Sequence, residues 1–307
     1  MLIKIGTRGS KLALWQAYYV EKMLQKDGID TQIIIIETKG DKILDRSLAK
    51  IGSKGVFTQE LEDQLLTGAI DIAVHSAKDL QSSLDLAFEL IAFTEREKAN
   101  DVLVSRNTSL SLKSGETFVV GTSSTRRIAV LKHFYPHIKT VDMRGNLQTR
   151  LRKLDEGQCD ALLLAYAGVH RMEYDDLIAE HLLLDEFTPA VGQGSVAIEC
   201  ASALSGEKKA LLKALLNDED TEKCLLAERA FLHKLQGGCS VPVFGMATLH
   251  AKQLSMTGGI ISLDGSKVIR KTLAGSETYP EQLGTAIADE LLDAGAGQIL
   301  EEIKGHQ

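Results

Sequence analysis

One cysteine, Cys239, lies in a glycine-rich segment that leaves room around its sulfur. Gly237 and Gly238 precede it and Pro242 follows, so the backbone can adopt positive φ before the thiol and is restrained after it. An accessible thiolate is a nucleophile and a point of covalent attachment, whereas an isolated cysteine is more often a small buried apolar residue. The glycines around Cys239 favour attachment of a bulky group, and the remaining residues decide between these interpretations.

Arginines recur where a predicted strand passes into a predicted helix. Three segments share this design: Arg8-Gly9-Ser10, Gly121 to Arg127, and Arg144-Gly145-Asn146 with Arg150 beyond it. Helix N-termini and guanidinium groups both bind anions, and six of the 12 arginines lie between positions 126 and 171 of a chain with net charge -7. The alternative for Arg126 and Arg127 is a solvated pair beyond an ordinary helix cap. The clustering predicts a site for an anionic ligand.

A carboxylate, Asp79, lies just beyond the predicted buried strand from Ile70 to His75. Open α/β sheets bind ligands at the carboxyl ends of their strands, so Asp79 is a candidate for proton transfer or charge stabilisation. The alternative is a turn aspartate that bonds to its own loop.

Apolar β-rich runs alternate with amphipathic helical patterns, which is typical of α/β architecture. Ser10 is the expected N-cap of a helix that ends at Gly28, and Thr58 similarly precedes a second helix. A second α/β series begins near Asn100. Glycines on both sides of Gln193 predict a hinge, followed by a strand that returns to the first domain. Further strands are expected at 2–6, 32–37, 86–93, 117–121, 138–141 and 160–164, and further helices at 124–134 and 146–155.

The pattern changes after Asp218, where one long helix to Leu235 precedes three meandering strands and a closing helix from about Pro280 to Ile303. We therefore expect three domains. Residues 1–95 and 195–215 form a discontinuous α/β domain, residues 96–194 an arginine-rich α/β domain, and residues 216–307 a small α+β domain that carries Cys239.

Composition excludes several classes of protein. Of the 307 residues, 44% are hydrophobic and 25% charged, which are ordinary values for globular proteins. The four cysteines follow no metal-ligand or disulfide spacing, which indicates reduced thiols, a cytoplasmic location and no metal. The N-terminus has no targeting pattern, no apolar run approaches the ~20 residues of a membrane helix, and the negative net charge argues against nucleic-acid binding.

Seven ordered motifs resemble the porphobilinogen deaminase family, whose members are also called hydroxymethylbilane synthases, over essentially the whole chain. They are Thr7 to Gln16, Gly52 to Phe57, Ala73 to Asp79, Gly121 to Arg127, Arg144 to Asn146, Pro189 to Gly194 and Gly237 to Pro242. The chain departs from the family where Ala77 replaces a bulkier methionine and where Gln81, Ser82 and Ser83 replace a usual proline. Every charged position of the motifs is retained.

The resemblance implies two domains like those of periplasmic binding proteins, with mixed sheets around a cleft, and a monomer. It also implies a dipyrromethane cofactor joined by a thioether to Cys239. On this primer, four porphobilinogen molecules add head to tail with loss of ammonia, and hydrolysis frees the linear tetrapyrrole. Pyrrole acetates and propionates make the cofactor, the substrate and the growing oligopyrrole polyanions, which suits an arginine-rich site.

The resemblance also implies a role for individual residues. Asp79 is the catalytic carboxylate, which stabilises the cationic pyrrole formed by loss of ammonia and assists proton transfer. Besides Cys239, the cofactor-binding residues are Lys78, Ser124, Arg126, Arg127, Arg144 and Gly145. The substrate-binding residues are Arg8, Ser10, Arg150, Arg171, Lys50 and Lys54, of which the two lysines belong to a loop that covers the site or are solvated.

A non-enzymatic, two-lobed protein that binds small anions is the rival interpretation. It would use the same arginines and hinge, but it needs neither a glycine-flanked thiol in a third domain nor a carboxylate, Asp79, within an anion site. A ligand-sensing regulator is a third class, but no segment is left over for a DNA-binding helix-turn-helix.

Overall fold

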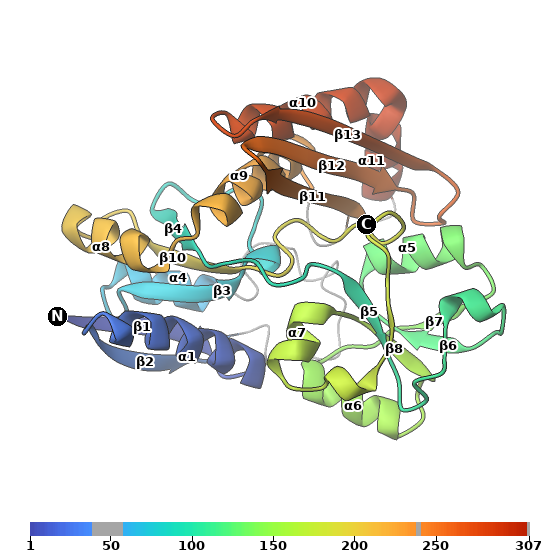
Figure 1. Ribbon diagram of the computed structural model, residues 1–307, viewed down its shortest axis with the longest axis horizontal. Helices are drawn as coiled ribbons and strands as arrows, with labels where there is room; N and C mark the ends of the chain where they lie inside the picture. Colours follow the sequence, from blue (N-terminus) through green and yellow to red (C-terminus); the bar gives the residue numbers. More distant parts are fainter. Residues whose placement is uncertain (39–57, 238–240, 306–307) are drawn as a thin grey trace.

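The computed structural model describes residues 1–38, 58–237 and 241–305. In this part of the chain, two five-stranded sheets and one three-stranded sheet each form the centre of a separate layered unit. Figure 1 shows the N-terminal unit in blue, the second unit in green and the C-terminal unit in red above them. The two mixed sheets and the smaller C-terminal unit confirm the expected fold class.

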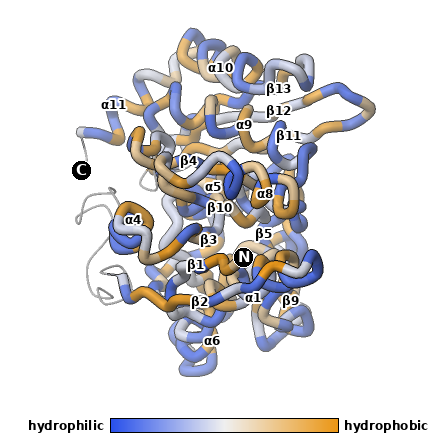
Figure 2. Tube along the Cα trace, turned by 90° about the vertical axis from the view of Figure 1, so that its left-hand side faces the viewer, coloured by the Kyte–Doolittle hydropathy of each residue, from blue (hydrophilic) through white to orange (hydrophobic). Residues whose placement is uncertain are grey.

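The first sheet has the strand order β2-β1-β3-β10-β4, in which β1 is parallel to β2 and β3, and β10 is antiparallel to β3 and β4. Its strands are β1 (Leu2–Arg8), β2 (Asp30–Ile36), β3 (Ile72–Ser76), β4 (Phe88–Phe93) and β10 (Val196–Ala201). The edge strand β2 ends in four isoleucines, visible as a hydrophobic stretch in Figure 2, of which Ile35 is 57% exposed.

Helices cover both faces of the first sheet because its buried residues alternate in direction. Ile72 and Val74 point to the face covered by α1 (Lys11–Lys26) and α8 (Gly206–Leu216), and Ala73 points to α4 (Gln59–Leu66). Ser10 caps α1 as predicted, and the chain turns out of the helix at Gly28 with φ +73°. Thr58, in contrast, precedes α4 without making a side-chain cap, and the sequence did not predict α8.

The second sheet repeats the topology of the first, with order β7-β6-β8-β5-β9 and β5 antiparallel to both neighbours. Its strands are β5 (Asp101–Val104), β6 (Val119–Gly121), β7 (Lys139–Val141), β8 (Ala161–Ala165) and β9 (Ile178–His181). Helix α5 (Thr125–Phe134) covers one face, and α6 (Leu147–Asp155) and α7 (Tyr166–Arg171) cover the other. The antiparallel strands β5 and β10 each follow a segment in which the chain passes between the first two units. Residues 94–100, before β5, are the first crossover, and residues 182–195, before β10, are the second crossover.

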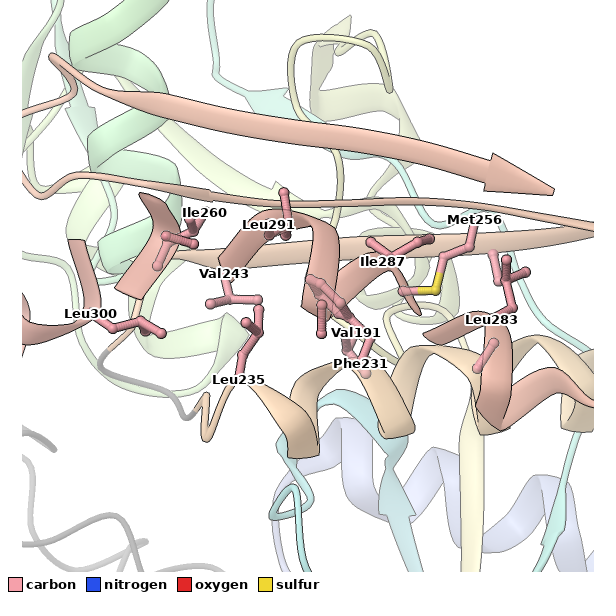
Figure 3. Packing of buried hydrophobic residues seen from close by; sticks show 14 of the residues in the cluster. Val191, Phe231, Leu235, Val243, Met256, Ile260, Leu283, Ile287, Leu291 and Leu300 are labelled. Atoms are coloured by element: carbon pink, nitrogen blue, oxygen red, sulfur yellow. The ribbon is translucent and has the colours of Figure 1, made fainter. Parts of the chain in front are cut away.

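The C-terminal unit packs helices against an antiparallel sheet of order β11-β12-β13. Its elements are α9 (Glu219–Lys234), β11 (Val243–His250), β12 (Gln253–Ile261), β13 (Val268–Ser276), α10 (Pro280–Leu291) and α11 (Gly297–Gly305). Figure 3 shows Phe231 and Leu235 among its buried apolar residues, with Val191 of the second crossover beside them. The expected single closing helix is wrong, because Gly295 has φ +99° and a π-helical segment separates α10 from α11.

Candidate functional site

Asp79 ends a single helical turn, Ala77–Asp79, directly after strand β3. Its carboxylate is exposed, and the neighbouring Lys78 is partly exposed. Burial of the Lys78 ammonium group lowers its pKa to about 8, although the adjacent Asp79 favours the charged form. An amine that titrates close to neutrality therefore lies beside an accessible carboxylate.

Arg126 and Arg127, in the first turn of α5, share one buried carboxylate. Arg126 donates to Asp101 Oδ2 at 2.7 Å, and Arg127 donates to Asp101 Oδ1 at 2.6 Å. Asp101 is 0% exposed, and the two arginines are 4% and 6% exposed. The alternative of a solvated arginine pair is therefore wrong.

The second crossover supplies another donor to Asp101. Gln193 Nε2 donates to Asp101 Oδ1 at 2.9 Å and to the Ala99 carbonyl at 2.6 Å. Burial alone would raise the pKa of Asp101, but the charges of Arg126 and Arg127 outweigh burial and hold this pKa well below its usual range. The carboxylate is therefore ionised and compensates part of the positive charge around it.

Arg127 retains donor capacity beyond its contact with Asp101. One terminal nitrogen donates to the Leu163 carbonyl at 2.9 Å, while the buried Nε atom has no hydrogen-bond partner among the described residues. An unpaired buried donor costs roughly 1–3 kcal/mol, so a ligand carboxylate at this nitrogen would be stabilising.

Arg150 of α6 extends the positive field toward Asp79. Burial, with smaller contributions from the charges of Arg127 and Arg144, lowers the pKa of Arg150 to about 10, although Asp79 opposes the shift. Lys78 in turn interacts with Asp79, Arg127 and Arg126. Residues from the end of β3, the start of α5 and helix α6 therefore form one electrostatic cluster.

Helix caps orient the polar turns of this cluster. The Ser124 hydroxyl accepts from the Arg127 amide at 3.5 Å, and Asn146 accepts from the Thr149 amide at 2.9 Å. Gly145 has φ +109°, and a β-carbon there would lie 2.6 Å from the Thr149 side chain. Its carbonyl accepts from Arg150 Nε at 2.9 Å, so Gly145 permits the turn that holds Arg150.

The N-terminal motif lies on the first unit, at the end of β1 and the start of α1. Arg8 is the last residue of β1, and the Ser10 hydroxyl caps α1 by accepting from the Ala13 amide at 3.3 Å. Gln16 Nε2 donates to the Ser76 hydroxyl at 2.8 Å, which ties α1 to the residue just before the turn that carries Asp79.

Arg144, after β7 of the second unit, lies 3.6 Å from the Asp142 carboxylate.

Arg171 lies at a contact between α7 and α1, and its partners among the described residues lie outside the Asp79 cluster. Its terminal nitrogen donates to the Gly194 carbonyl at 2.7 Å, and its guanidinium lies 5.1 Å from the centre of the Trp15 ring. Burial lowers the pKa of Arg171, and its charge partners are Glu97 and Tyr19. The contacts of Arg171 are therefore with the second crossover and α1.

Sequence reasoning missed Asp101 and the hydrogen bonds of Gln193. The available signal was a charged residue, Asp101, at the start of the apolar run Val102 to Val104. A charged residue at the start of a buried strand needs a partner of opposite charge. Spacing along the sequence does not identify arginines that lie 25 residues away as that partner.

Cys239, Lys50 and Lys54 lie outside the described residues. The other three cysteines, Cys159, Cys200 and Cys224, are buried free thiols. Burial raises the pKa of Cys159, and it raises the pKa of both Cys200 and Cys224 to about 11. Buried, protonated thiols are poor nucleophiles, so these three are unsuited to covalent attachment.

Within the described ranges, no group of three or more His, Cys, Asp or Glu residues could hold a metal ion. No helix among these residues is long and apolar enough to span a bilayer.

Comparison with known proteins gives matches over nearly the whole chain. Residues 3–210 match the family model "Porphobilinogen deaminase, dipyromethane cofactor binding domain", and residues 222–293 match "Porphobilinogen deaminase, C-terminal domain". A porphobilinogen deaminase of Cytophaga hutchinsonii is 59% identical over 302 residues, 98% of this chain and 97% of the relative. One of Desulfosudis oleivorans is 52% identical over 308 residues, 100% of this chain and 99% of the relative.

Among solved structures, the second substrate binding domain of a putative amino acid ABC transporter from Streptococcus pneumoniae has a TM-score of 0.44 to this chain at 12% identity. The match covers 70% of this chain and 91% of that domain.

Proposed function

Because the chain belongs to the porphobilinogen deaminase family, we propose that Asp79 is its catalytic carboxylate and that the surrounding cationic residues hold its anionic cofactor and substrate. The family membership makes the chain a hydroxymethylbilane synthase, a transferase of tetrapyrrole biosynthesis with a dipyrromethane cofactor. It joins four porphobilinogen molecules head to tail with release of ammonia. The non-enzymatic alternative is not favoured, since the relatives match over both family domains.

The donor set of the cluster fits a cofactor that carries several carboxylates. Arg127 has a buried Nε atom with no hydrogen-bond partner among the described residues, and Lys78 and Arg150 have lowered pKa values because they are buried without full compensation of their charges. A bound polyanion would stabilise each of these charged forms. When bound, the dipyrromethane supplies the nucleophilic pyrrole carbon to which porphobilinogen is added.

We propose that Lys78, Arg127 and Ser124 bind the cofactor carboxylates from the end of β3 and the start of α5. Arg126 contributes mainly by position, because Asp101 and the Thr188 carbonyl already occupy its two terminal nitrogens. Arg144 and Gly145 complete the cofactor set from the turn before α6, and Cys239 is the point of covalent attachment. The buried state of the three described cysteines supports this choice of thiol.

Arg8, Ser10 and Arg150 are the proposed substrate-binding residues, to which Lys50 and Lys54 add positive charge. Arg171 is a weaker candidate because the Gly194 carbonyl and the Trp15 ring engage its guanidinium. If Arg171 binds substrate, it does so after giving up part of these contacts. A conformational change between the first two units would then accompany substrate binding.

The observation that carries the catalytic assignment is an exposed carboxylate beside two partly buried cations. Asp79 interacts electrostatically with both Lys78 and Arg150. A carboxylate weakens the binding of anions, so its place here is explained by the positive charge that develops on a pyrrole as ammonia leaves. Asp79 would stabilise that charge and hold the proton to be transferred.

Replacing Asp79 by Asn tests the assignment. Turnover should fall by about two or more powers of ten, the scale of one electrostatic or proton-transfer group, while the cofactor mass is retained. Intact-mass spectrometry and the rate of porphobilinogen consumption measure the two effects separately. Near-normal turnover of a folded, cofactor-loaded variant would contradict the role of Asp79.

We further propose three domains with the bounds 1–95 with 195–215, 96–194, and 216–307, a division supported by the membership of strands in the three sheets. The protein is proposed to act in the cytoplasm as a monomer, without a nucleic-acid or membrane partner, in accord with its reduced cysteines and net charge of -7. Sedimentation of the cofactor-loaded protein tests the monomer.

A further inference from the structure

Gly192, in the second crossover, lies against the backbone of the turn that carries Lys78 and Asp79. A β-carbon built on Gly192 would lie 2.8 Å from the carbonyl carbon of Ala77 and 2.9 Å from the amide nitrogen of Lys78. Real β-carbons essentially never approach this closely, and peptide atoms cannot rotate away as a side chain can. The contact between the crossover and the Ala77–Lys78 peptide therefore requires glycine.

The same part of the crossover also holds this turn by a hydrogen bond. The Ala77 amide donates to the Ser195 carbonyl at 3.0 Å, and the Ser195 amide donates back to the Gly192 carbonyl at 3.3 Å. Residues 192–195 thus contact the turn at two places, one steric and one hydrogen-bonded. The position of the turn is determined by the crossover as well as by strand β3.

The crossover is anchored in turn to the C-terminal unit. The Gly192 amide donates to Glu228 Oε2 of α9 at 2.8 Å, and Glu228 is 0% exposed. The other Glu228 oxygen accepts from the Ala247 amide of β11 at 2.8 Å, and Arg96 of the first crossover forms an ion pair with the same carboxylate. One buried carboxylate therefore connects both crossovers with α9 and β11.

Apolar packing reinforces this anchor. Val191 lies in the hydrophobic core of the C-terminal unit, near Phe231 of α9 (Figure 3). The Gly245 amide of β11 also donates to the Pro189 carbonyl at 3.0 Å. Helix α9 then leads, through Leu235, toward the segment with Cys239. Contacts thus run continuously from α9 to the peptide bond just before Lys78.

We propose that Gly192 is a positioning residue, which places the Lys78–Asp79 turn relative to the helix that leads to Cys239. The proposal deepens the function proposed above, since it assumes that Asp79 is catalytic and that Cys239 holds the cofactor. Among the described residues, a β-carbon on Gly192 would lie closest to the backbone of Ala77 and Lys78. Gly192 acts by allowing the crossover to approach the turn so closely that Asp79 keeps its position relative to α9.

The test compares Gly192→Ala with Gly157→Ala, a control that matches it in backbone conformation. Gly192 has φ +77° and Gly157 has φ +74°, but a β-carbon on Gly157 would meet nothing within 4 Å. Both variants carry the same strain of an alanine at positive φ, and only Gly192→Ala adds the clash with the turn.

We expect Gly192→Ala to lower kcat by about 10²-fold, the scale of a 1 Å misplacement, while KM changes far less and the cofactor mass is retained. Gly157→Ala should keep the kcat of the wild type. Equal kcat values for the two variants would overturn the proposal. In an Asp79→Asn background, Gly192→Ala should cause little further loss of kcat, and a full additional loss would likewise overturn it.

A second pair of variants covers the case in which Gly192→Ala does not fold. Asparagine tolerates positive φ better than alanine but still carries a β-carbon, so Gly192→Asn keeps the clash with less strain. Folded Gly192→Asn should show the same loss of kcat relative to Gly157→Asn, and a normal kcat would overturn the proposal. The Asp79→Asn variant alone tests the proposed function: if it loses turnover while both Gly192 variants remain active, only the role of Gly192 fails.

Discussion

Arg127 and Asp101 form a buried ion pair in which Arg127 Nη2 lies 2.6 Å from Asp101 Oδ1. Arg126 completes the group by donating to the second carboxylate oxygen. Two cations and one anion are thus enclosed together, which leaves a net positive charge at the base of the proposed cofactor site. Asp101 therefore holds the two guanidinium groups in place.

Replacing Asp101 by Asn should strongly destabilise the protein, because two buried guanidinium groups lose their shared counter-charge. Breaking a buried ion pair by removing one partner costs roughly 3–5 kcal/mol of unfolding free energy. Chemical denaturation at neutral pH measures this loss. Asp155→Asn is the control, since it removes an exposed ion pair with Arg106 and should leave the midpoint nearly unchanged; an equally small effect at Asp101 would contradict the role of the buried pair.

Asp101 should also contribute to acid denaturation. Its pKa in the folded protein is lower than in the unfolded chain, so its stabilising contribution is complete above the unfolded pKa of about 4. The contribution should be lost as the pH falls from that value toward the lower folded pKa. Denaturation curves of wild type and Asp101→Asn should therefore converge as the solution is acidified, and curves that stay equally far apart would contradict this linkage.

Lys78 should make uptake of the cofactor weaken at alkaline pH. Its pKa of about 8 in the cofactor-free protein means that it loses its charge as the pH rises through that value, so the rate at which the apoprotein gains the cofactor mass should decline there. Lys78→Arg should remove this decline because a guanidinium stays charged. An unchanged decline in Lys78→Arg would assign the titration to another group.

The lowered pKa of Lys78 should also make the folded protein more stable as the pH rises. The unfolded chain holds the Lys78 proton up to its ordinary pKa of 10.5, whereas the folded protein releases it near 8. The unfolding free energy from this group therefore rises between these two pH values. Lys78→Met should abolish that rise, and denaturation at several pH values measures it.

Cys239 should be the attachment point of the cofactor. Cys239→Ser should yield folded protein without the mass of two pyrroles, whereas Ser at Cys159, Cys200 or Cys224 should keep that mass, because burial and raised pKa values make these thiols unreactive. Intact-mass spectrometry and peptide mapping identify the modified residue. Finding the cofactor on one of the three described cysteines would refute the assignment.

Local features of the sequence were sufficient to predict the alternation of strands and helices and the cap at Ser10, whereas Thr58 makes no side-chain cap. Ser10, Ser124 and Asn146 each bond to an amide three residues ahead, so the spacing that forms the cap is visible in the chain itself. The sequence missed strands β5 and β9, which lack a long periodic pattern. Such local patterns do not predict the order of the strands within the sheets.

The sequence by itself determined which groups are available for chemistry: a carboxylate after β3, arginines at helix starts and a glycine-flanked cysteine. Only the tertiary structure decided that Asp101 compensates both Arg126 and Arg127, that Arg171 stacks on Trp15, and that Gly192 touches the turn before Asp79. Caps depend on neighbours within one helical turn, whereas these contacts join residues brought together by strand order and crossovers. Their partners are selected by the packing of the whole chain, which spacing along the sequence does not encode.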